Sequence, residues 1–412
     1  PMPELRLFLT SLGRLLWLAW RAPWPAAPAR MGPALRRALI LLGFLPLFAL
    51  VQLIHWVGLL LDEILFPGFR RVEIREPLFV LGVPRSGTTH LHRTLARDPQ
   101  FTTFSTWECL FAPSVTQRRL WMGLGWLDGR LGRPLGRTLS WLEGRAFRRL
   151  EAVHPMGLSN PEEDYLVLLP ALACFILVLP FPVDPYLWRM GTFDRDMPAA
   201  ERARLMAFYR GCLQRHLYVH GPGKRLLSKN AAFAPLAGSL RETFPDARFL
   251  VCLREPAATL PSQLSAVEPG VRLFGSLEAM PGFRERLAHQ LGFYYENLGR
   301  ALGQLPEDRC VWVTMDSLKA QLRETLRLVY DRLGLELPAA YAAWLAHESK
   351  RSRGYRSGHR YTLGQFGLTE AGLRPDLGPS YARLAERALR PGSRAAIQPL
   401  SPRRQGQAAP RC

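Results

Sequence analysis

The pattern of apolar and polar positions divides the chain near residue 70. Between Leu5 and Trp24, four polar residues fall on one stripe of a helix, and Leu, Phe and Trp fill the remaining positions. Arg6, Thr10, Arg14 and Arg21 form that stripe. The pattern is typical of a helix that lies in a membrane interface, and a helix packed on the protein body fits it as well.

A second apolar segment, Ala38 to Leu61, contains no formal charge. As a helix it would reach about 36 Å, enough to cross a hydrocarbon core of about 30 Å. Pro46, Gln52 and His55 weaken a simple spanning helix, because proline can kink it into a re-entrant hairpin. The segment therefore predicts a membrane-embedded helix, with a buried core helix as the alternative. A cleaved signal peptide fits badly, because the apolar stretch starts late and is too long.

The rest of the chain predicts an α/β domain. Residues 77–82, 248–253 and 310–315 are short apolar runs without alternation, as expected of parallel strands covered on both faces, and 226–228 is a fourth candidate. Helical patterns occupy residues 90–96, 199–219, 235–244, 283–305 and 318–333. This alternation predicts a P-loop-like three-layer α/β fold, with a central parallel sheet flanked by helices and membrane-associated helices at the N-terminus.

We expect three regions in the chain. Residues 1–66 form the membrane-associated helices, 67–390 the α/β domain, and 391–412 a disordered tail with four arginines and no acidic residue. Within the domain, the apolar segment 167–182 is too short to span a bilayer and is interrupted by prolines. It is expected in the core, where it could line an apolar acceptor pocket.

Charge and cysteine usage narrow the possible partners. The 54 basic and 34 acidic residues give a net charge of +20, which suits anionic lipid or an anionic ligand. Only four basic residues are lysines, and we attach no nucleic-acid function to the arginine excess. The six cysteines form no CxxC pair or metal-ligand spacing, so neither a metal site nor a disulfide framework is expected.

The strongest chemical signal is the loop Gly82 to Thr89, which follows the first apolar run and opens a helix. Backbone N–H groups at a helix N-terminus, with hydroxyls and a cation beside them, make an anion site. The spacing is similar to that of the nucleotide-binding P-loop. However, Thr88 stands where the P-loop lysine belongs, and Arg85 supplies the positive charge, which points away from ATP.

The motif PRSGTT, formed by Pro84 to Thr89, resembles the 5′-phosphosulfate loop of sulfotransferases that use 3′-phosphoadenosine 5′-phosphosulfate (PAPS). Arg254 and Ser262, in LREPAATLPS, resemble the 3′-phosphate clamp of that family. Similarity to its membrane-associated bacterial branch lies in LDEILFP, NPEED, LLSKN and FPDA, and spans roughly residues 60 to 370. The resemblance implies a nucleotide co-substrate held by Arg85, Ser86, Gly87, Thr88, Thr89, Arg254 and Ser262.

The resemblance also implies catalytic residues. Lys229 matches the lysine that contacts the bridging oxygen between phosphate and sulfuryl group. The family's histidine base is absent, because Ala231 occupies its position. Glu108 in STWECL and Glu163 in NPEED are alternative bases, with His154 a third, and the sequence leaves this choice open. The basic segment 350–360 resembles the family's C-terminal lid over the nucleotide.

These features predict a membrane-associated enzyme that transfers a sulfuryl group from PAPS to a hydroxyl of an amphiphilic acceptor, without a metal. A P-loop nucleotide kinase and a non-catalytic membrane-associated nucleotide binder are the rival hypotheses. Arginines before the apolar segment favour an N-terminus inside and a body outside. The donor of this family is cytoplasmic in bacteria, however, so we expect a monotopic or re-entrant anchor with the catalytic domain on the cytoplasmic face.

Overall fold

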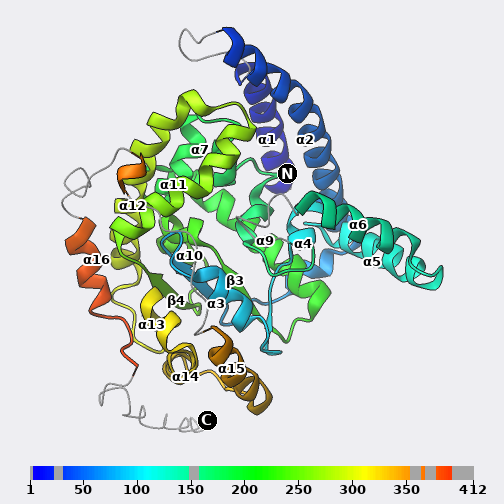
Figure 1. Ribbon diagram of the computed structural model, residues 1–412. Coiled ribbons are helices and arrows are strands. Elements are labelled where there is room, and N and C mark those ends of the chain that lie inside the picture. Colours follow the sequence, from blue (N-terminus) through cyan, green and yellow to red (C-terminus); the bar gives the residue numbers. More distant parts are fainter. Residues whose placement is uncertain (1–2, 23–30, 148–156, 353–362, 367–376, 392–412) are drawn as a thin grey trace, which may run out of the picture.

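Five short parallel strands form the centre of the molecule, a computed structural model that describes residues 3–22, 31–147, 157–352, 363–366 and 377–391 (Figure 1). The strands are β1 (Leu78–Gly82), β2 (Phe101–Thr102), β3 (Arg225–Lys229), β4 (Arg248–Leu253) and β5 (Cys310–Thr314). Their order across the sheet is β2-β3-β1-β4-β5. The chain first builds on one side of β1 and then crosses to the other. In such sheets ligands bind outside the carboxyl ends of the strands where the order reverses, which is here the end of β1.

Helices cover both faces of the sheet, because successive strand residues point to opposite sides. Leu78 and Val80 face one core, with helices α3 (Thr88–Leu95), α13 (Met315–Ala320), α14 (Leu322–Arg332) and α15 (Ala339–Ser352). Phe79 and Leu81 face the second and larger core. These two cores confirm the predicted three-layer α/β fold with a parallel sheet.

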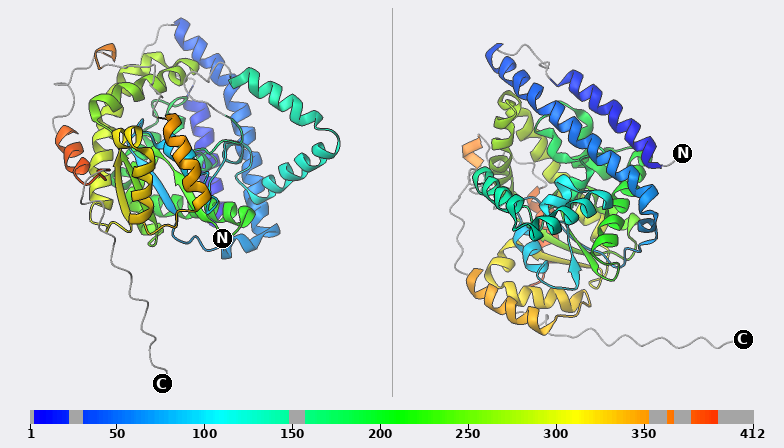
Figure 2. Two further views of the ribbon diagram at one scale, coloured as in Figure 1. Left: turned by 60° about the horizontal axis from the view of Figure 1, so that its bottom comes forward. Right: turned by 90° about the vertical axis from the view of Figure 1, so that its right-hand side faces the viewer.

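Among the described residues, ten further helices close the larger core (Figures 1 and 2). They are α1 (Pro3–Arg21), α2 (Met31–Leu65), α4 (Thr106–Phe111), α7 (Pro185–Arg189), α8 (Phe193–Asp196), α9 (Ala199–His220), α10 (Ala237–Thr243), α11 (Pro256–Leu273), α12 (Met280–Leu302) and α16 (Leu377–Ala385). The described side chains of α5 (Val115–Arg130) and α6 (Pro134–Phe147) lie outside this core. Residues 164–168, 175–178 and 231–236 form 3-10 turns.

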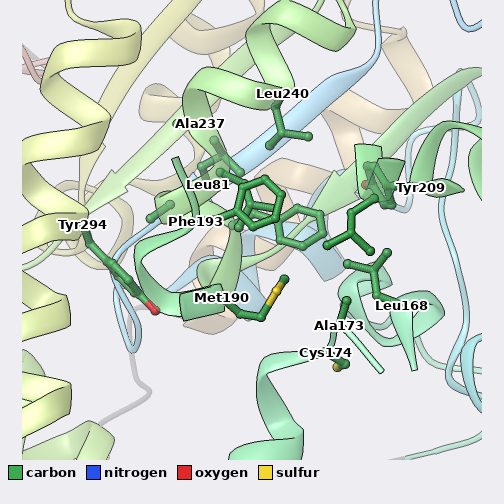
Figure 3. Close-up of a cluster of buried hydrophobic side chains, with 14 of the residues drawn as sticks. Leu81, Leu168, Ala173, Cys174, Met190, Phe193, Tyr209, Ala237, Leu240 and Tyr294 are labelled. Atoms are coloured by element: carbon green, nitrogen blue, oxygen red, sulfur yellow. The ribbon is translucent and has the colours of Figure 1, made fainter. Parts of the chain in front are cut away.

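The apolar segment 167–182 is part of this core, as predicted. Leu168, Ala173 and Cys174 are buried and lie beside Phe193 from α8 and Met190 (Figure 3). The prolines keep the segment in short 3-10 turns instead of a long helix. It therefore fills the layer between the sheet and the N-terminal helices.

Helices α1 and α2 lie side by side along the outside of the body (Figure 2). Leu7 and Leu18 of α1, and Leu41 and Leu59 of α2, are buried in the same core cluster as the sheet residues. Helix α2 is long and apolar enough to cross a membrane, but it is continuous through Pro46, so the hairpin expected there does not form. The region expected as a membrane-associated unit thus shares its core with the α/β domain.

A buried ion cluster fastens these helices to the body. Arg215 of α9 is fully buried, and its Nε donates to Asp62 Oδ2 at 2.9 Å. Its Nη2 contacts both carboxylate oxygens of Glu4 and one oxygen of Glu63 at 3.1 Å. Asp62 also accepts hydrogen bonds at 2.8 Å from the backbone N–H groups of Val115 and Thr116. One arginine therefore joins α1, α2 and α9, and its partner Asp62 holds the start of α5.

The strands predicted from continuous apolar runs are present in the structure. The four predicted strands are β1, β3, β4 and β5, with no end shifted by more than one residue. β2 was not predicted because it has two residues, and α5, α6 and α11 were not predicted because glycines and prolines interrupt their patterns. The predicted tail and most of the predicted lid lie outside the described residues.

We predict that Arg215→Met lowers the free energy of unfolding by about 3–5 kcal/mol, because it removes the cation that pairs with buried Asp62 and one of the two that pair with buried Glu4. Urea unfolding in mild detergent, followed by tryptophan fluorescence, measures the change. Arg327→Met is the matched control, since its pair with Glu324 is exposed, and should cost less than about 1 kcal/mol. Equal effects of the two substitutions would contradict a structural role for the cluster.

Candidate active site

The loop after β1 has a backbone conformation that two glycines permit. A methyl group added to Gly82 would lie 2.3 Å from the carbonyl oxygen of Cys252 in β4, so only glycine allows this close approach. Gly87 has φ of +88°, in the left-handed region, and is the N-cap of α3. The buried hydroxyl of Ser86 donates to the carbonyl oxygen of Val83 at 2.7 Å. The loop thus turns back on itself and directs the N-terminus of α3 to the carboxyl edge of the sheet.

Two arginines lie together beside this loop. Arg85 Nε donates to Ser262 Oγ of α11 at 3.1 Å, and Arg254 Nη1 donates to the carbonyl oxygen of Arg85 at 2.9 Å. Tyr295 donates to the carbonyl oxygen of Arg254 and fixes the end of β4. Burial, and next the charge of Arg85, lower the pKa of Arg254. Among the described residues neither guanidinium forms an ion pair, so their charges favour an anion between them.

Lys229, the last residue of β3, is the third cation at this edge. It pairs in register with Val80, two residues before Gly82. Its side chain is 3% exposed, and its Nζ donates to Thr89 Oγ1 at 3.2 Å and to Glu163 Oε1 at 2.5 Å. The structure therefore brings Lys229 and Glu163 together at the first turn of α3.

A buried aspartate positions Glu163. The carboxylate of its neighbour Asp164 accepts hydrogen bonds from Tyr209 Oη at 2.6 Å, from Ser228 Oγ at 2.9 Å, and from the amide of Asn230. Burial raises the pKa of Asp164 to about 6, against the lowering effect of these donors. Asp164 thus attaches the NPEED segment to both α9 and β3. Because Glu163 is the preceding residue, this attachment fixes its position as well.

Glu108 occupies a separate pocket of buried charge. Its Oε2 accepts from the backbone N–H and hydroxyl of Ser105, at 2.9 and 2.6 Å, and so caps α4. Its Oε1 lies 2.5 Å from His220 Nε2 and 3.7 Å from Arg118 Nε. Burial alone would raise the pKa of Glu108, but Arg118, the His220 hydrogen bond and His216 outweigh it and hold the pKa well below its usual range. Both oxygens are therefore occupied, and the carboxylate is a weak base.

Glu108, His216 and His220 also offer three ligand atoms within 4.8 Å of one another, which is a spacing suited to a metal ion. Fully buried Arg118 already lies among them, and its Nη1 donates to His216 Nδ1 at 3.4 Å. His216 Nε2 then donates to Thr102 Oγ1 at 2.9 Å, in the neutral form that its lowered pKa, caused by burial, favours. The guanidinium supplies the positive charge that Glu108 needs, so we assign no metal to this cluster.

The structure gathers most of the residues singled out from the sequence. Arg85, Arg254 and Ser262 meet at one side of the loop 82–89, here called the phosphate loop. Lys229 meets Glu163 at its other side. Sequence reasoning missed the supporting residues Asp164, Tyr209, Asn230, Arg118, His216 and His220. The pair His216 and His220, at i and i+4 on a helix, was a usable signal for a polar cluster. His154 and most of the 350–360 segment lie outside the described residues.

Comparisons with known proteins identify the family of the chain. A model of the sulfotransferase family matches residues 77–339. Omega-hydroxy-beta-dihydromenaquinone-9 sulfotransferase Stf3 from Mycobacterium bovis, and that from Mycobacterium tuberculosis, are each 24% identical over 266 residues. The match spans 63% of this chain and 63% of the length of these curated relatives.

Solved structures show the same fold. Sulfotransferase STF1 from Mycobacterium tuberculosis has a TM-score of 0.62 at 21% identity, over 94% of this chain and 93% of that one. Sulfotransferase STF9 from Mycobacterium avium has a TM-score of 0.64 at 19% identity, over 92% and 95%. The family model covers more than half of the chain and includes the phosphate loop, Glu163, Lys229 and Arg254. The chain therefore belongs to the sulfotransferase family.

Proposed function

We propose that the protein transfers a sulfuryl group from PAPS to a hydroxyl of an amphiphilic acceptor. The observation that carries this proposal is the arrangement of three cations at one edge of the sheet. Arg85 and Arg254 lie on one side of the phosphate loop, and Lys229 lies against its Thr89. Two separated groups of positive charge suit a donor with phosphate at two ends.

The described residues fit such a donor. Ser86, Gly87, Thr88 and Thr89, with the N-terminus of α3, would hold the 5′-phosphosulfate, because N–H groups and the helix dipole favour an anion there. Arg254 and Ser262 would hold the 3′-phosphate, and the lowered pKa of Arg254 still leaves its guanidinium charged. When bound, the donor supplies an activated sulfuryl group whose leaving group is a phosphate.

Lys229 is proposed to stabilise the negative charge that develops on the phosphate-side bridging oxygen as the S–O bond breaks. A fixed cation beside that oxygen has its largest effect where charge grows, in the transition state. Thr89 Oγ1 accepts a hydrogen bond from the ammonium and directs it toward the loop. The side chain is almost fully buried, which strengthens its electrostatic effect relative to a lysine in water.

Glu163 is proposed as the base that takes the proton of the acceptor hydroxyl. Its Oε1 contacts Lys229, so its carboxylate lies next to the cation that acts on the donor. Glu108 is the weaker candidate, because both of its oxygens are occupied by a helix cap, histidine and arginine. A base needs a pKa near the working pH, and the environment of Glu108 shifts its pKa the other way.

The two rival functions are less well supported. A nucleotide kinase needs a lysine on the β- and γ-phosphates, where this loop carries Thr88. A non-catalytic binder would not need the buried contact between Lys229 and Glu163, which places a cation and a carboxylate together beside the phosphate loop. The kinase and the binder are each an outcome of the experiments below.

The membrane surface is proposed as the place of reaction, with a monotopic anchor. Both ends of α2 are bound to the body, since Arg37 donates to the carbonyl oxygen of Pro180 at 2.8 Å and Asp62 pairs with Arg215. In between, Trp56 Nε1 donates to the carbonyl oxygen of Pro170. These contacts favour a helix half-immersed in one leaflet. The cytoplasmic face is proposed because the donor of this family is made in the cytoplasm of bacteria. The Stf3 relatives, whose printed acceptor is a hydroxylated dihydromenaquinone, support a lipid-like acceptor.

PAP, the product nucleotide, should stabilise the protein without any metal. At 100 times its Kd, mass action adds about 2.7 kcal/mol to the free energy of unfolding. Arg254→Ala should weaken PAP binding by about 2–5 kcal/mol, since it breaks a desolvated charge contact. Thermal unfolding and calorimetry measure both effects. Adenosine 5′-phosphosulfate lacks the 3′-phosphate and is the matched control ligand, whose affinity should change little. Stabilisation by ATP with Mg²⁺ but not by PAP would establish the kinase instead.

Lys229→Met should separate catalysis from binding, because it keeps the length and packing of the side chain and deletes its charge. We expect sulfuryl transfer to fall by about two to three decades, as for loss of an oxyanion donor elsewhere. PAP affinity should change by less than about tenfold, or roughly 1.4 kcal/mol. Single-turnover transfer from labelled PAPS to a model alcohol gives the rate. Transfer at the wild-type rate would make Lys229 an ordinary buried lysine.

Glu163→Gln and Glu108→Gln distinguish the two candidate bases. The first should lower single-turnover transfer in the folded protein by about two decades or more, since general-base catalysis contributes on that scale, and should also cost stability because it removes the carboxylate beside buried Lys229. The second should mainly lower the thermal midpoint, because it disrupts the cap of α4 and the buried contact with Arg118. If Glu108→Gln abolishes transfer in a fully folded protein and Glu163→Gln does not, the assignment of the base is reversed.

A further inference from the structure

Helices α5 and α6 form a hairpin, here called the arm, that leaves the body beside α2 (Figures 1 and 2). Only its base packs on the body: Val115 and Arg118 are buried, and α5 contacts α2 and α9. From residue 119 to residue 141 every residue is exposed, except buried Asp128 and half-buried Gly136. The arm therefore exposes 21 of these 23 residues to its surroundings.

The exposed part of the arm is strongly apolar. Its large apolar side chains are 39% to 68% exposed. They are Leu120, Trp121, Met122, Leu124, Trp126, Leu127, Leu131, Leu135, Leu139 and Trp141. On α5 they point in all directions, because consecutive helical positions are turned by about 100°. A helix that is apolar on all sides belongs in a protein core or in lipid, and this part of the arm is exposed on the surface of the molecule.

Between residues 119 and 141 of the arm, the exposed charged side chains are all positive. Arg119, Arg130, Arg133 and Arg137 are exposed. The only acidic residue between 119 and 141 is Asp128, whose buried carboxylate accepts the backbone N–H groups of Leu135 and Gly136 at 2.8 Å and caps α6. Arginine with tryptophan and leucine is the composition of a helix in an anionic membrane interface.

Glycine usage also indicates an apolar environment. Gly123, Gly125 and Gly129 lie within α5, and a methyl group added to any of them would meet no other atom within 4 Å. Packing therefore does not require these glycines, and each costs about 1 kcal/mol relative to alanine in a helix exposed to water. Glycine is more frequent in membrane helices than in soluble ones.

The arm is continuous with the apolar outer side of α2. Leu50, Leu53 and Val57 of α2 are about half exposed or more, and α2 packs directly against the start of α5. Asp62 holds that junction through the N–H groups of Val115 and Thr116. A membrane that contacts the outer side of α2 would therefore also lie beside the arm.

We propose that the α5–α6 arm is a second membrane-docking element, which lies in an anionic lipid interface with its Trp and Leu side chains among the acyl chains and its arginines on lipid phosphates. It goes beyond the proposed reaction, and none of the residues changed below belongs to the candidate active site. The arm and α2 would then contact one leaflet at two places and fix the orientation of the body on it.

Vesicle binding of the full chain tests the charge of the arm. Vesicles of phosphatidylcholine with 30% phosphatidylglycerol are compared with pure phosphatidylcholine in flotation assays. Arg133→Gln with Arg137→Gln should weaken binding to the anionic vesicles by about tenfold, because the double substitution removes two positive charges that would contact lipid phosphates. Arg323→Gln with Arg327→Gln, on exposed positions of α14, is the control of equal charge and should have no such effect. Equal losses for both pairs would overturn the proposal.

A local probe separates the arm from the anchoring by α1 and α2. In a Cys412→Ser background, an environment-sensitive fluorophore on Ser140→Cys should shift to the blue when vesicles are added, and one on Gln321→Cys of the exposed α14 start should not. Trp126→Ser with Trp141→Ser should reduce the shift while PAP binding stays at the wild-type level. A Ser140→Cys signal that does not change when vesicles are added would overturn the proposal. A signal that depends only on protein concentration would also overturn it, and would indicate that a second copy of the chain covers the arm.

Discussion

The arrangement of this molecule depends on one buried arginine. Arg215 lies on α9 without solvent contact, and its guanidinium is balanced by Asp62, Glu4 and Glu63 from the two N-terminal helices. A buried charge is tolerable only when its partners are in place, so α9 cannot pack in its observed position unless α1 and α2 lie against it. The helices with the most exposed apolar surface are thereby fastened to the helix that reaches the active site. The face that we assign to the membrane and the catalytic edge of the sheet are thus held in one fixed orientation.

From α9 the same logic of buried charge extends to the candidate active site. Tyr209, on α9, donates to Asp164, and Asp164 also receives Ser228 of β3 and Asn230 just after it. The raised pKa of Asp164, caused by burial, indicates that its carboxylate is retained against an energetic cost. What it achieves is position, because the residue before it, Glu163, then contacts Lys229. The separate Glu108 cluster has the opposite character, since its carboxylate is fully neutralised and holds α4 in place.

The parts that could be predicted from sequence are those with a local physical cause. Continuous apolar runs located β1, β4 and β5, and the glycine and hydroxyl pattern of residues 82–89 located the anion site, because both signals lie within a few neighbouring residues. The sequence could not decide between Glu108 and Glu163 as the base, because the partner of each carboxylate is distant in the chain. Glu163 contacts Lys229, more than sixty positions away, and Glu108 contacts His220, more than one hundred positions away. The arm escaped prediction because its glycines and arginines interrupt any helical apolar stripe, although that composition is informative once its exposure is known.

The distribution of charge on the molecule connects these observations. Positive charge is found where an anion is expected to bind, at Arg85 and Arg254 beside the phosphate loop and on the exposed arginines of the arm. Two acidic residues near these regions are compensated, because Asp128 is buried in a helix cap and Glu163 is paired with Lys229. Such separation costs stability, because like charges gather without compensation, and it persists where ligands supply the missing negative charge. Under the two proposals, a nucleotide phosphate at the sheet edge and lipid phosphates at the arm would satisfy the two regions independently, and the enzyme would remain on a membrane while its nucleotide exchanges.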